Sequence, residues 1–484
     1  MEWIVVVVYC TALFAIFLFS LSQLHLTWIY TRPKSTDTSN FDSDYEPIVT
    51  VQLPVFNEKY VAERLIDSIT KLDYPKHKLE IQVLDDSTDE TVEIIARKVA
   101  QYQAEGFDIL QIRRTDRKGF KAGALAHGTE ICRGEFMAIF DSDFLPGSDF
   151  IKRTVGYFGN EKIGMVQTRW GHVNKDYSML TEMQAFGLDA HFTVEQGGRN
   201  RSGSFMNFNG TAGIWRKSCV LDAGGWSADT LTEDLDLSYR AQLKGWKFQF
   251  DETVESPAEL PVIMSAIKSQ QYRWNKGAAE TAKKNLFNVF RSDMSFMIKL
   301  HAAMHLLNSS VFVLLLTASV LSIPMLYIKD ANAGLEWLFN LGSFFLLGFF
   351  SIATFYYVGL KQIEKVRTRV IFLKKFPLFL SFSMGLALHN AMAVMEGFLG
   401  FKTPFIRTPK FNITTKNESW VSNQYIKTKL TWGTLLEGVL CLYFVMGIVS
   451  AWWLHDFGLI IFHIMLATGF GIIFFHSLKN VKHA

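Results

Sequence analysis

The sequence predicts an α/β domain attached to a bundle of membrane-spanning helices. Residues 3–31 contain no Asp, Glu, Lys or Arg, and several further long apolar blocks follow residue 304. Between these regions, residues 45–280 alternate short apolar runs with amphipathic stretches. A spanning helix needs about 20 apolar residues, whereas alternating strands and helices indicate a mostly parallel sheet with helices on both faces. The two patterns together give the fold class.

The composition excludes several classes of protein. The chain has 484 residues with 49 basic and 46 acidic side chains, and a formal charge of +3 implies no nucleic-acid partner. Hydrophobic residues make up 49% of the chain, which excludes a disordered protein. The four cysteines lie far apart and form no CxxC pair, so neither a structural zinc site nor a disulfide framework is expected.

Residues 1–31 predict an uncleaved membrane anchor. The alternative, a secretory signal peptide, needs basic residues before a short apolar core. Here only Glu2 precedes the core, the core is too long, and Arg32 and Lys34 follow it. Because basic flanks favour the cytoplasmic side, we expect the C-terminal end of this helix to face the cytoplasm.

The apolar segments after residue 304 predict four more spans, two within 304–359 and two within 431–476. A further apolar segment, 376–400, lies between two basic stretches at 361–375 and 401–429. If it crossed the bilayer, one of these basic flanks would lie outside, so we expect it to lie along the interface or to re-enter, and we assign it as an interfacial helix.

Two regions beside the spans have other predicted structures. Residues 281–303 begin with a mixture of charged and apolar side chains that is typical of an interfacial helix. Residues 360–430 are predicted to form a basic loop, the interfacial helix already described and a further loop, and the basic tail 477–484 is expected in the cytoplasm.

The domain at 45–280 begins with four apolar runs that read as strands, each of the first three followed by a predicted helix. Ligands of such sheets bind at the carboxyl ends of the strands. A dinucleotide-binding dehydrogenase would need a Gly-rich turn after the first strand, but that position reads PVFNEKY. That class is therefore excluded. The predicted strands are residues 48–54, 79–84, 108–113 and 136–140.

Acidic residues occupy the predicted strand ends instead. Asp85 and Asp86 follow the second strand, where helix caps are an equally good interpretation. Asp141 and Asp143 follow the fourth strand, and two carboxylates beside a buried strand are costly unless a cation compensates them. Mg²⁺ and Mn²⁺ prefer oxygen ligands, so either ion, bridging a diphosphate, is the predicted occupant.

Two further motifs lie later in the domain. Glu233 and Asp234 open an apparent helix, where acids also simply complement the helix dipole. Gln270, Arg273 and Trp274 place hydrogen-bond donors beside a large aromatic ring, although such a helix face is commonly just packed. We interpret the four motifs as one site because they occur in order within a single membrane-tethered α/β domain.

With these motifs the chain resembles membrane-embedded family 2 glycosyltransferases with the glycosyltransferase-A fold. The similarity covers about residues 48–280, through QVLDDSTD, AIFDSDFLP, EDLDLSYRAQLKGWKF and QQYRWNKG. It is strongest to the cellulose synthase-like group, which includes glucomannan 4-β-mannosyltransferases and xyloglucan-backbone glucan synthases. FIRTPK at 405–410 is similar to the FxVTxK gating loop of bacterial cellulose synthase, with Arg407 in place of Val.

The resemblance implies transfer of a hexose from UDP-glucose or GDP-mannose to a growing chain with inversion, and it implies a role for each motif residue. Asp141 and Asp143 would hold Mn²⁺ or Mg²⁺. Asp234 would be the general base, with Glu233 orienting it. The other implied contacts are Asn57, Glu58, Asp85 and Asp86 with the base and ribose, Lys121, Gln270 and Arg273 with the phosphates, and Gly210 and Trp274 with the acceptor sugar.

The expected function is therefore processive synthesis of a β-linked polysaccharide, with passage of the chain through the protein's own helices. Such an enzyme would be a multi-pass protein of a bacterial inner, Golgi or plasma membrane, with its catalytic domain in the cytoplasm and the bilayer as a partner. One alternative is the addition of a single sugar to a membrane lipid, as in ceramide glucosyltransferases. An inactive scaffold or transporter is the other alternative.

Overall fold

The computed structural model describes residues 2–33, 41–332, 334, 346–403, 406–415, 418, 420, 424–425 and 430–482. Parts of several predicted segments lie outside this range. They are residue 1 of the anchor, residues 336–345 of the third span, residues 483–484 of the tail and, within the predicted region 360–430, residues 404–405, 416–417, 419, 421–423 and 426–429, which include Phe405 of the FIRTPK stretch.

A seven-stranded mixed sheet forms the centre of the α/β domain, in the order β3-β2-β1-β4-β6-β5-β7. The strands β1 to β4 pair in parallel, β5 pairs with β7 in parallel, and β6 runs antiparallel between β4 and β5. The prediction of a mostly parallel sheet is thus confirmed, with β6 as the exception. The strands are β1 Val49–Val55, β2 Leu79–Asp85, β3 Asp108–Ile112, β4 Phe136–Ile139, β5 Ile163–His172, β6 Gly213–Arg216 and β7 Lys247–Ala258.

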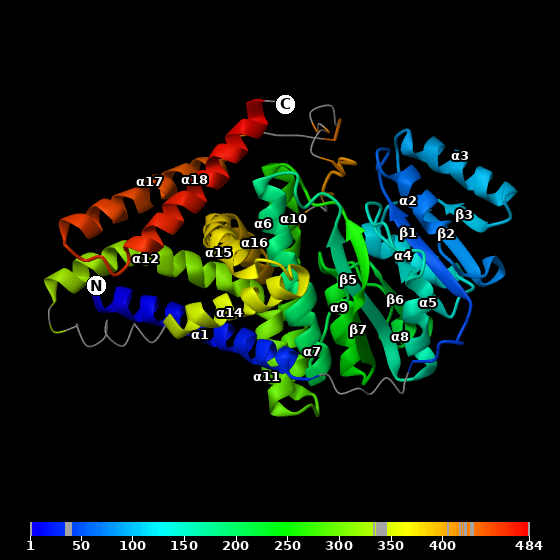
Figure 1. Ribbon diagram of the computed structural model, residues 1–484, viewed down its shortest axis with the longest axis horizontal. Helices are drawn as coiled ribbons and strands as arrows, with labels where there is room; N and C mark the ends of the chain where they lie inside the picture. Colours follow the sequence, from blue (N-terminus) through cyan, green and yellow to red (C-terminus); the bar gives the residue numbers. More distant parts are fainter. Residues whose placement is uncertain are drawn as a thin grey trace.

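Helices cover both faces of this sheet (Figure 1). On one face, Leu65, Ile95 and Phe150 belong to the hydrophobic core, and on the other Leu125 and Leu237 do. Burial on both faces explains why the predicted strands read as continuous apolar runs. The helices of the domain are α2 Ala62–Ile69, α3 Thr91–Ala104, α4 Phe120–Ile131, α5 Phe150–Val155, α6 Met179–Ala190, α7 Gln196–Ser202, α8 Lys217–Asp222 and α9 Glu233–Leu243, with the short helices η1 Lys76–Lys78, η2 Gly156–Gly159 and η3 His191–Glu195.

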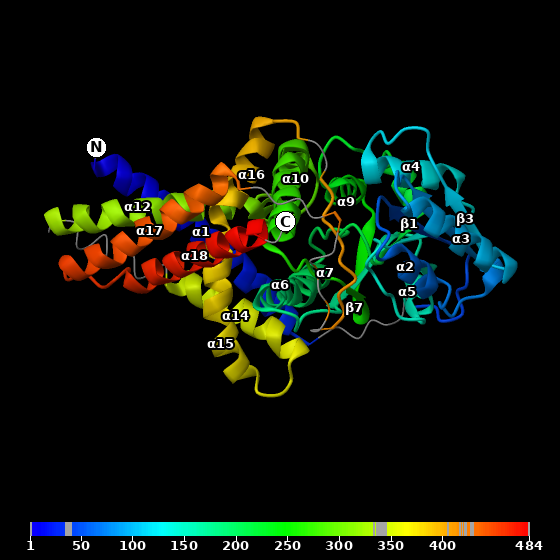
Figure 2. The same cartoon turned by 90° about the horizontal axis from the view of Figure 1, so that it is seen from above.

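The remaining helices form a bundle beside the α/β domain. In the described part of the chain, five of them are long and apolar enough to cross a membrane. A sixth candidate is the pair α15 and α16, which bend by 49° at their junction, and Figure 2 shows α15 lying across the direction of α12, α17 and α18. The five are α1 Glu2–Thr31, α12 Val311–Ala331 after the short η4 Asn308–Ser310, α14 Leu346–Ile363, α17 Trp432–Trp453 and α18 Ile460–Lys482, and the bent pair is α15 Thr368–Gly385 and α16 Ala387–Leu399.

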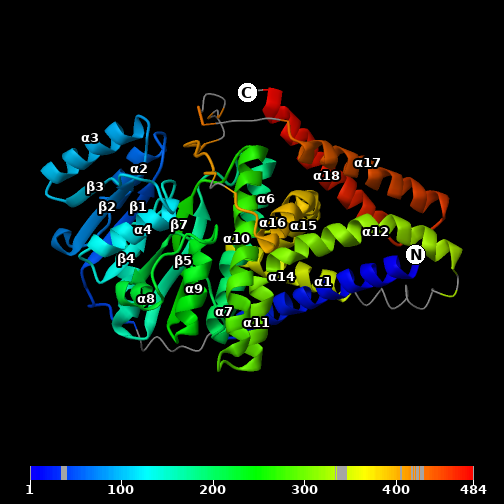
Figure 3. The same ribbon diagram turned by 180° about the vertical axis from the view of Figure 1, so that it is seen from behind.

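One long helix, α10 (Met264–Arg291), stands between the sheet and the bundle (Figures 1 and 3). The predicted domain boundary at residue 280 falls inside this helix, since no break occurs there. It is followed by α11 (Phe296–Leu306), and the exposed Phe287, Phe290 and Phe296 at their junction have the apolar character predicted for an interfacial segment. The assignment of these helices to the interface stays a prediction, as does the sidedness of the membrane.

A buried ion pair connects α10 to the last two spans. The Nζ atom of Lys268 lies 2.7 Å from Oε2 of Glu437 on α17 and donates a hydrogen bond of 2.9 Å to Oγ of Ser477 on α18. Glu437 is 1% exposed. Because a buried charge without its partner costs free energy, the pair of Lys268 and Glu437 fixes α10 relative to α17.

Candidate active site

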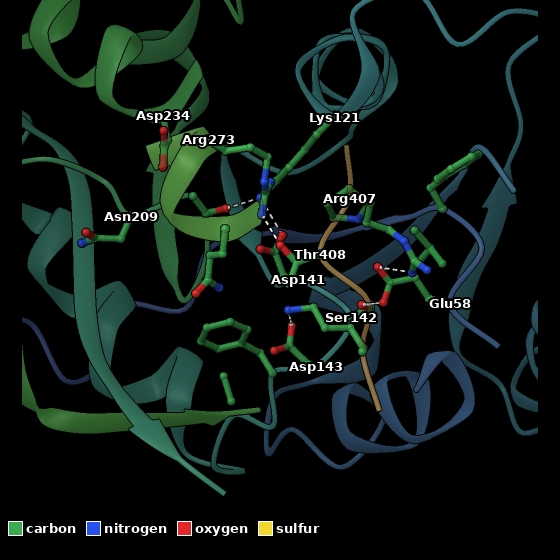
Figure 4. Close-up of a pocket in the computed structure, with 18 of the residues that line it drawn as sticks. Glu58, Lys121, Asp141, Ser142, Asp143, Asn209, Asp234, Arg273, Arg407 and Thr408 are labelled. Atoms are coloured by element: carbon green, nitrogen blue, oxygen red, sulfur yellow. Dashed lines mark hydrogen bonds and ion pairs between the residues drawn. The ribbon is translucent and has the colours of Figure 1, made fainter. Parts of the chain in front are cut away.

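A pocket at the carboxyl edge of β1, β2 and β4 gathers most of the predicted site residues (Figure 4). It is closed on the other side by the start of α9 and by α10. All the predicted site residues line it except Asn57 and Asp85. Those that do are Glu58, Asp86, Lys121, Asp141, Asp143, Gly210, Glu233, Asp234, Gln270, Arg273 and Trp274.

The side chains of Asn57 and Asp85 form hydrogen bonds that stabilise the loops around the pocket. The side-chain oxygen of Asn57 accepts the backbone N–H of Thr88 at 2.8 Å, which joins two neighbouring loops. The two Asp85 oxygens accept hydrogen bonds from the backbone N–H of Ser87 and the side-chain amide of Gln111. Asp85 stabilises the loop after β2 and does not cap a helix, because α3 begins only at Thr91 and its N-cap residue is Glu90. The predicted contacts of Asn57 and Asp85 with the base and ribose stay predictions.

Asp86 remains at the pocket wall, although it is paired. Its Oδ1 accepts from Nε of Arg114 at 3.0 Å, and Nη2 of the same guanidinium donates to Oδ2. Two parallel hydrogen bonds fix the carboxylate plane. Beside it, the Arg117 guanidinium lies 3.2 Å from the ring centre of Phe56, and both side chains line the pocket.

Asp141 and Asp143, which we call the DxD motif, each have a carboxylate that faces a lysine. Nζ of Lys121 lies 2.5 Å from Oδ1 of Asp141 and donates at 2.8 Å to the carbonyl oxygen of Gly210. Nζ of Lys410 lies 2.8 Å from Oδ1 of Asp143, which is 1% exposed. The sequence argument that these acids require a cation beside them is thus met by lysines in this structure.

Asp141 and Asp143 can supply only part of the oxygen coordination that a hard divalent ion needs. Among the described residues, no group of three or more His, Cys, Asp and Glu side chains could hold a metal ion. An ion at Asp141 and Asp143 would therefore need further oxygen ligands from water or from a bound phosphate. The donor set fits Mg²⁺ or Mn²⁺ on that condition.

Asp234 sits deep in the pocket at the first turn of α9. Burial, followed by the negative charge of Glu233, raises the pKa of Asp234 to about 7, although Lys121 opposes the shift. Burial alone would lower the pKa of Lys121, but the charges of Asp141 and Glu233 raise it above its ordinary value. A carboxylate with a pKa near neutral beside a cation that stays protonated is suited to accept a proton.

Gly210 makes room for this pair. Its φ is +79°, a left-handed conformation that glycine adopts without strain. A Cβ atom placed there would lie 3.0 Å from Oδ2 of Asp234 and 3.4 Å from Nζ of Lys121. The close approach of the Asp234 carboxylate thus requires glycine at position 210. The predicted contact of Gly210 with an acceptor sugar stays a prediction.

Gln270, Arg273 and Trp274 reach the pocket from the first half of α10. Nη2 of Arg273 donates to Oγ1 of Thr408 at 2.9 Å. Burial lowers the pKa of Arg273, whereas Asp141, Glu233 and Asp234 act in the opposite sense. Three acids facing one guanidinium keep it charged and aimed at the centre of the pocket.

A stretch far along the chain completes the site. Residues 406–412, which we call the crossing segment, pass over the pocket (Figure 4). Nη1 of Arg407 lies 2.9 Å from Oε1 of Glu58, whose Oε2 accepts a hydrogen bond from Ser142 Oγ. Sequence analysis placed none of Arg407, Thr408 and Lys410 in the site, although the resemblance of FIRTPK to a gating loop was a signal for them.

Comparisons with known proteins agree on the α/β domain. A family model described as "Glycosyltransferase like family 2" matches residues 47–277. Glucomannan 4-beta-mannosyltransferase 1 of Oryza sativa subsp. japonica is 41% identical over 265 residues, which cover 54% of this chain and 51% of that protein. Glucomannan 4-beta-mannosyltransferase 7 of Arabidopsis thaliana is 38% identical over 291 residues, or 57% and 52% of the two chains.

Each of these alignments spans about half the length of the curated relative. Among solved structures, the mannosyltransferase PcManGT from Pyrobaculum calidifontis, in complex with GDP-Man and Mn²⁺, superposes with a TM-score of 0.54. The match is 19% identical and covers 76% of this chain and all of that one. At this identity the likeness concerns the fold.

Proposed function

We propose that this chain polymerises a hexose from a nucleotide sugar into a β-linked polysaccharide, because residues 47–277 match the model of glycosyltransferase-like family 2. The observation that carries this proposal is the pocket itself. It brings the DxD carboxylates, the half-buried Asp234 and the Arg273 guanidinium to one sheet edge beside a bundle of apolar helices. A nucleotide diphosphate needs cations, and a hydroxyl acceptor needs a base, and the pocket offers both.

We propose mannose as the transferred sugar and GDP-mannose as the donor. The support is the name of the relatives, which are glucomannan 4-beta-mannosyltransferases at about 40% identity within the aligned half. UDP-glucose is the competing donor that the sequence resemblance left open. The product would be a β-1,4-linked chain of the mannan or glucomannan type.

The diphosphate would lie among Lys121, Arg273 and Lys410, whose cationic groups converge on the DxD end of the pocket. The guanidinium of Arg273 can hold two phosphate oxygens at once, and the lysines act as point charges. These contacts stabilise the negative charge that grows on the leaving diphosphate.

Asp141 and Asp143 would hold Mn²⁺ or Mg²⁺, a cofactor supported by their oxygen donors and by the strand-end position. The ion supplies additional charge neutralisation for the leaving diphosphate. Because Lys121 and Lys410 already face these carboxylates, both lysines would shift toward phosphate oxygens when the donor binds.

Asp234 would accept the proton of the acceptor hydroxyl as that oxygen attacks the anomeric carbon from the face opposite the diphosphate. This in-line arrangement inverts the configuration at that carbon. Trp274 offers a flat apolar surface for the acceptor sugar on the side of the pocket nearest α10. The chain would then leave past α10 toward the membrane helices.

The proposal is tested with the purified full-length protein in lipid nanodiscs and a panel of GDP-mannose, UDP-glucose, GDP-glucose and UDP-N-acetylglucosamine. We expect GDP-mannose to give a ladder of oligosaccharides that an endo-β-mannanase degrades. A single sugar on extracted lipid would favour the alternative lipid glycosyltransferase. No transfer from any donor would contradict the assignment of an active enzyme.

The pH profile is a separate prediction. Asp234 acts as a base only when it is deprotonated, so kcat/KM is expected to fall as the pH drops below about 7. In Glu233→Gln the neighbouring negative charge is lost, which moves this acid limb to lower pH, while burial still keeps it above the usual range of a carboxyl group. Profiles of the two proteins, measured with saturating acceptor, check the shift, and an unmoved limb would contradict the role of Asp234.

A further inference from the structure

Glu259 connects the crossing segment to the α/β domain. It follows β7, is 5% exposed, and lines the pocket between Ala258 and Leu260. Its Oε1 accepts the backbone N–H of Phe411 and its Oε2 that of Asn412, both at 2.9 Å. One buried carboxyl group thus accepts hydrogen bonds from two consecutive amide groups. Burial and the charge of Asp143 raise its pKa to about 7, whereas Lys410 and the Phe411 amide favour its charged form.

The same residue also contacts the DxD motif. The backbone N–H of Glu259 donates to Oδ2 of Asp143 at 3.3 Å, while Oδ1 of Asp143 faces Lys410. The remaining charge near the Glu259 carboxylate is the guanidinium of Arg64, with Nη2 at 3.9 Å from Oε2. Glu259 therefore lies at the point where the strand edge, the DxD acid and the crossing segment meet.

The chain on either side shows why an anchor is needed there. The crossing segment has neither helix nor strand from residue 406 to residue 412, so no backbone ladder holds it. Before it, Lys276 Nζ donates to Oγ1 of Thr403 at 2.9 Å, which fixes its approach from α16. At its far end Asn412 has φ +59°, a left-handed conformation that asparagine tolerates, so the chain turns directly after the two amide groups held by Glu259.

We propose that Glu259 is a positioning residue, whose carboxylate holds the crossing segment at Phe411 and Asn412 so that Arg407, Thr408 and Lys410 stand in the donor pocket. The inference rests on the proposed function for its effect on turnover, but its structural part does not. Glu259 needs no contact with the sugar to act. It determines where the lysine beside Asp143 is found.

The structural part is tested by hydrogen–deuterium exchange in full-length protein, with Glu259→Gln. The amide side chain keeps one acceptor and replaces the other by a donor that would face an N–H group. We expect the peptide spanning residues 406–413, which contains the amides held by Glu259 but not those held by Glu418, to exchange about tenfold faster. Glu418→Gln is the matched control, because Glu418 also accepts two amides, those of Thr414 and Thr415, but is exposed and away from the pocket.

The functional part separates binding from chemistry. In Glu259→Gln we expect the Kd of GDP, measured by calorimetry, and the KM of the donor to rise about tenfold, while kcat changes much less. Glu418→Gln is expected to match the unsubstituted protein in all three quantities. Unchanged exchange of residues 406–413 and unchanged GDP affinity in Glu259→Gln would each overturn the proposal.

A double-mutant cycle with Lys410→Ala shows whether Glu259 acts through the segment. If it does, Glu259→Gln adds little to the loss of GDP affinity already caused by Lys410→Ala. Fully additive losses would mean that Glu259 acts by another route and would overturn the proposal. The exchange result is independent of turnover, so failure of the proposed function, seen as no transfer from any donor, is distinguishable from failure of this inference.

Discussion

Asp234→Asn is expected to lower kcat by about 10²–10⁴-fold, the range that a positioned general base contributes. The asparagine keeps the shape of the side chain in its space beside Gly210, but it cannot take a proton. The carboxylate is also buried with Glu233, so its removal relieves a repulsion between like charges and does not unfold the site. Turnover of labelled donor under saturating conditions measures the loss.

The control for this prediction is Asp222→Asn. Asp222 ends α8 and pairs with Lys244 at 3.1 Å on the surface, away from the pocket. Its turnover should equal that of the unsubstituted protein, and the GDP affinity of Asp234→Asn should stay within a few fold of normal. A variant Asp234→Asn that still polymerises at an ordinary rate would remove this residue from the role of base.

The second large effect concerns the divalent ion at the DxD motif. Removal of divalent ions with EDTA is expected to stop transfer, and added Mn²⁺ or Mg²⁺ should restore it. Asp143→Asn takes away one oxygen charge and the carboxylate that Lys410 faces at 2.8 Å, so we expect a loss of about 100-fold or more in kcat/KM. Binding of Mn²⁺ in the presence of GDP, followed by electron paramagnetic resonance, gives an independent readout.

Asp149→Asn is the matched substitution for this second experiment. Asp149 precedes α5, is exposed and pairs with Arg153 at 3.3 Å. The Asp149→Asn variant should have the same Mn²⁺ affinity and the same turnover as the unsubstituted protein. Undiminished activity after removal of all divalent ions would contradict the metal assignment, and the two lysines would then have to neutralise the diphosphate alone.

The sequence was informative where a local pattern determines structure. The strands at 49–55 and 79–85 are apolar because both faces of the sheet are buried, and the acids at their ends fall at one edge because parallel strands finish together. The position of β6 was not predictable in this way. It follows a loop, is only four residues long and enters the sheet antiparallel between β4 and β5.

The rest of the site depends on contacts between distant parts of the chain. Asp85 and Asp86 are neighbours with the same chemistry, yet their partners differ. Gln111 donates a hydrogen bond to Asp85, whereas Arg114 pairs with Asp86 at the pocket wall. Glu259 and Phe411 are 152 residues apart, and no spacing rule links them. Such pairs are set by how the crossing segment packs, which a single sequence does not encode in any periodic pattern.

The ion pair between Lys268 and Glu437 has a mechanical consequence. Lys268 and Arg273 lie on the same uninterrupted α10 helix, and a helix resists bending over so few residues. The backbone positions of Lys268 and Arg273 must therefore move together. A tilt of α17 would therefore be transmitted along α10 to the Arg273 guanidinium in the pocket.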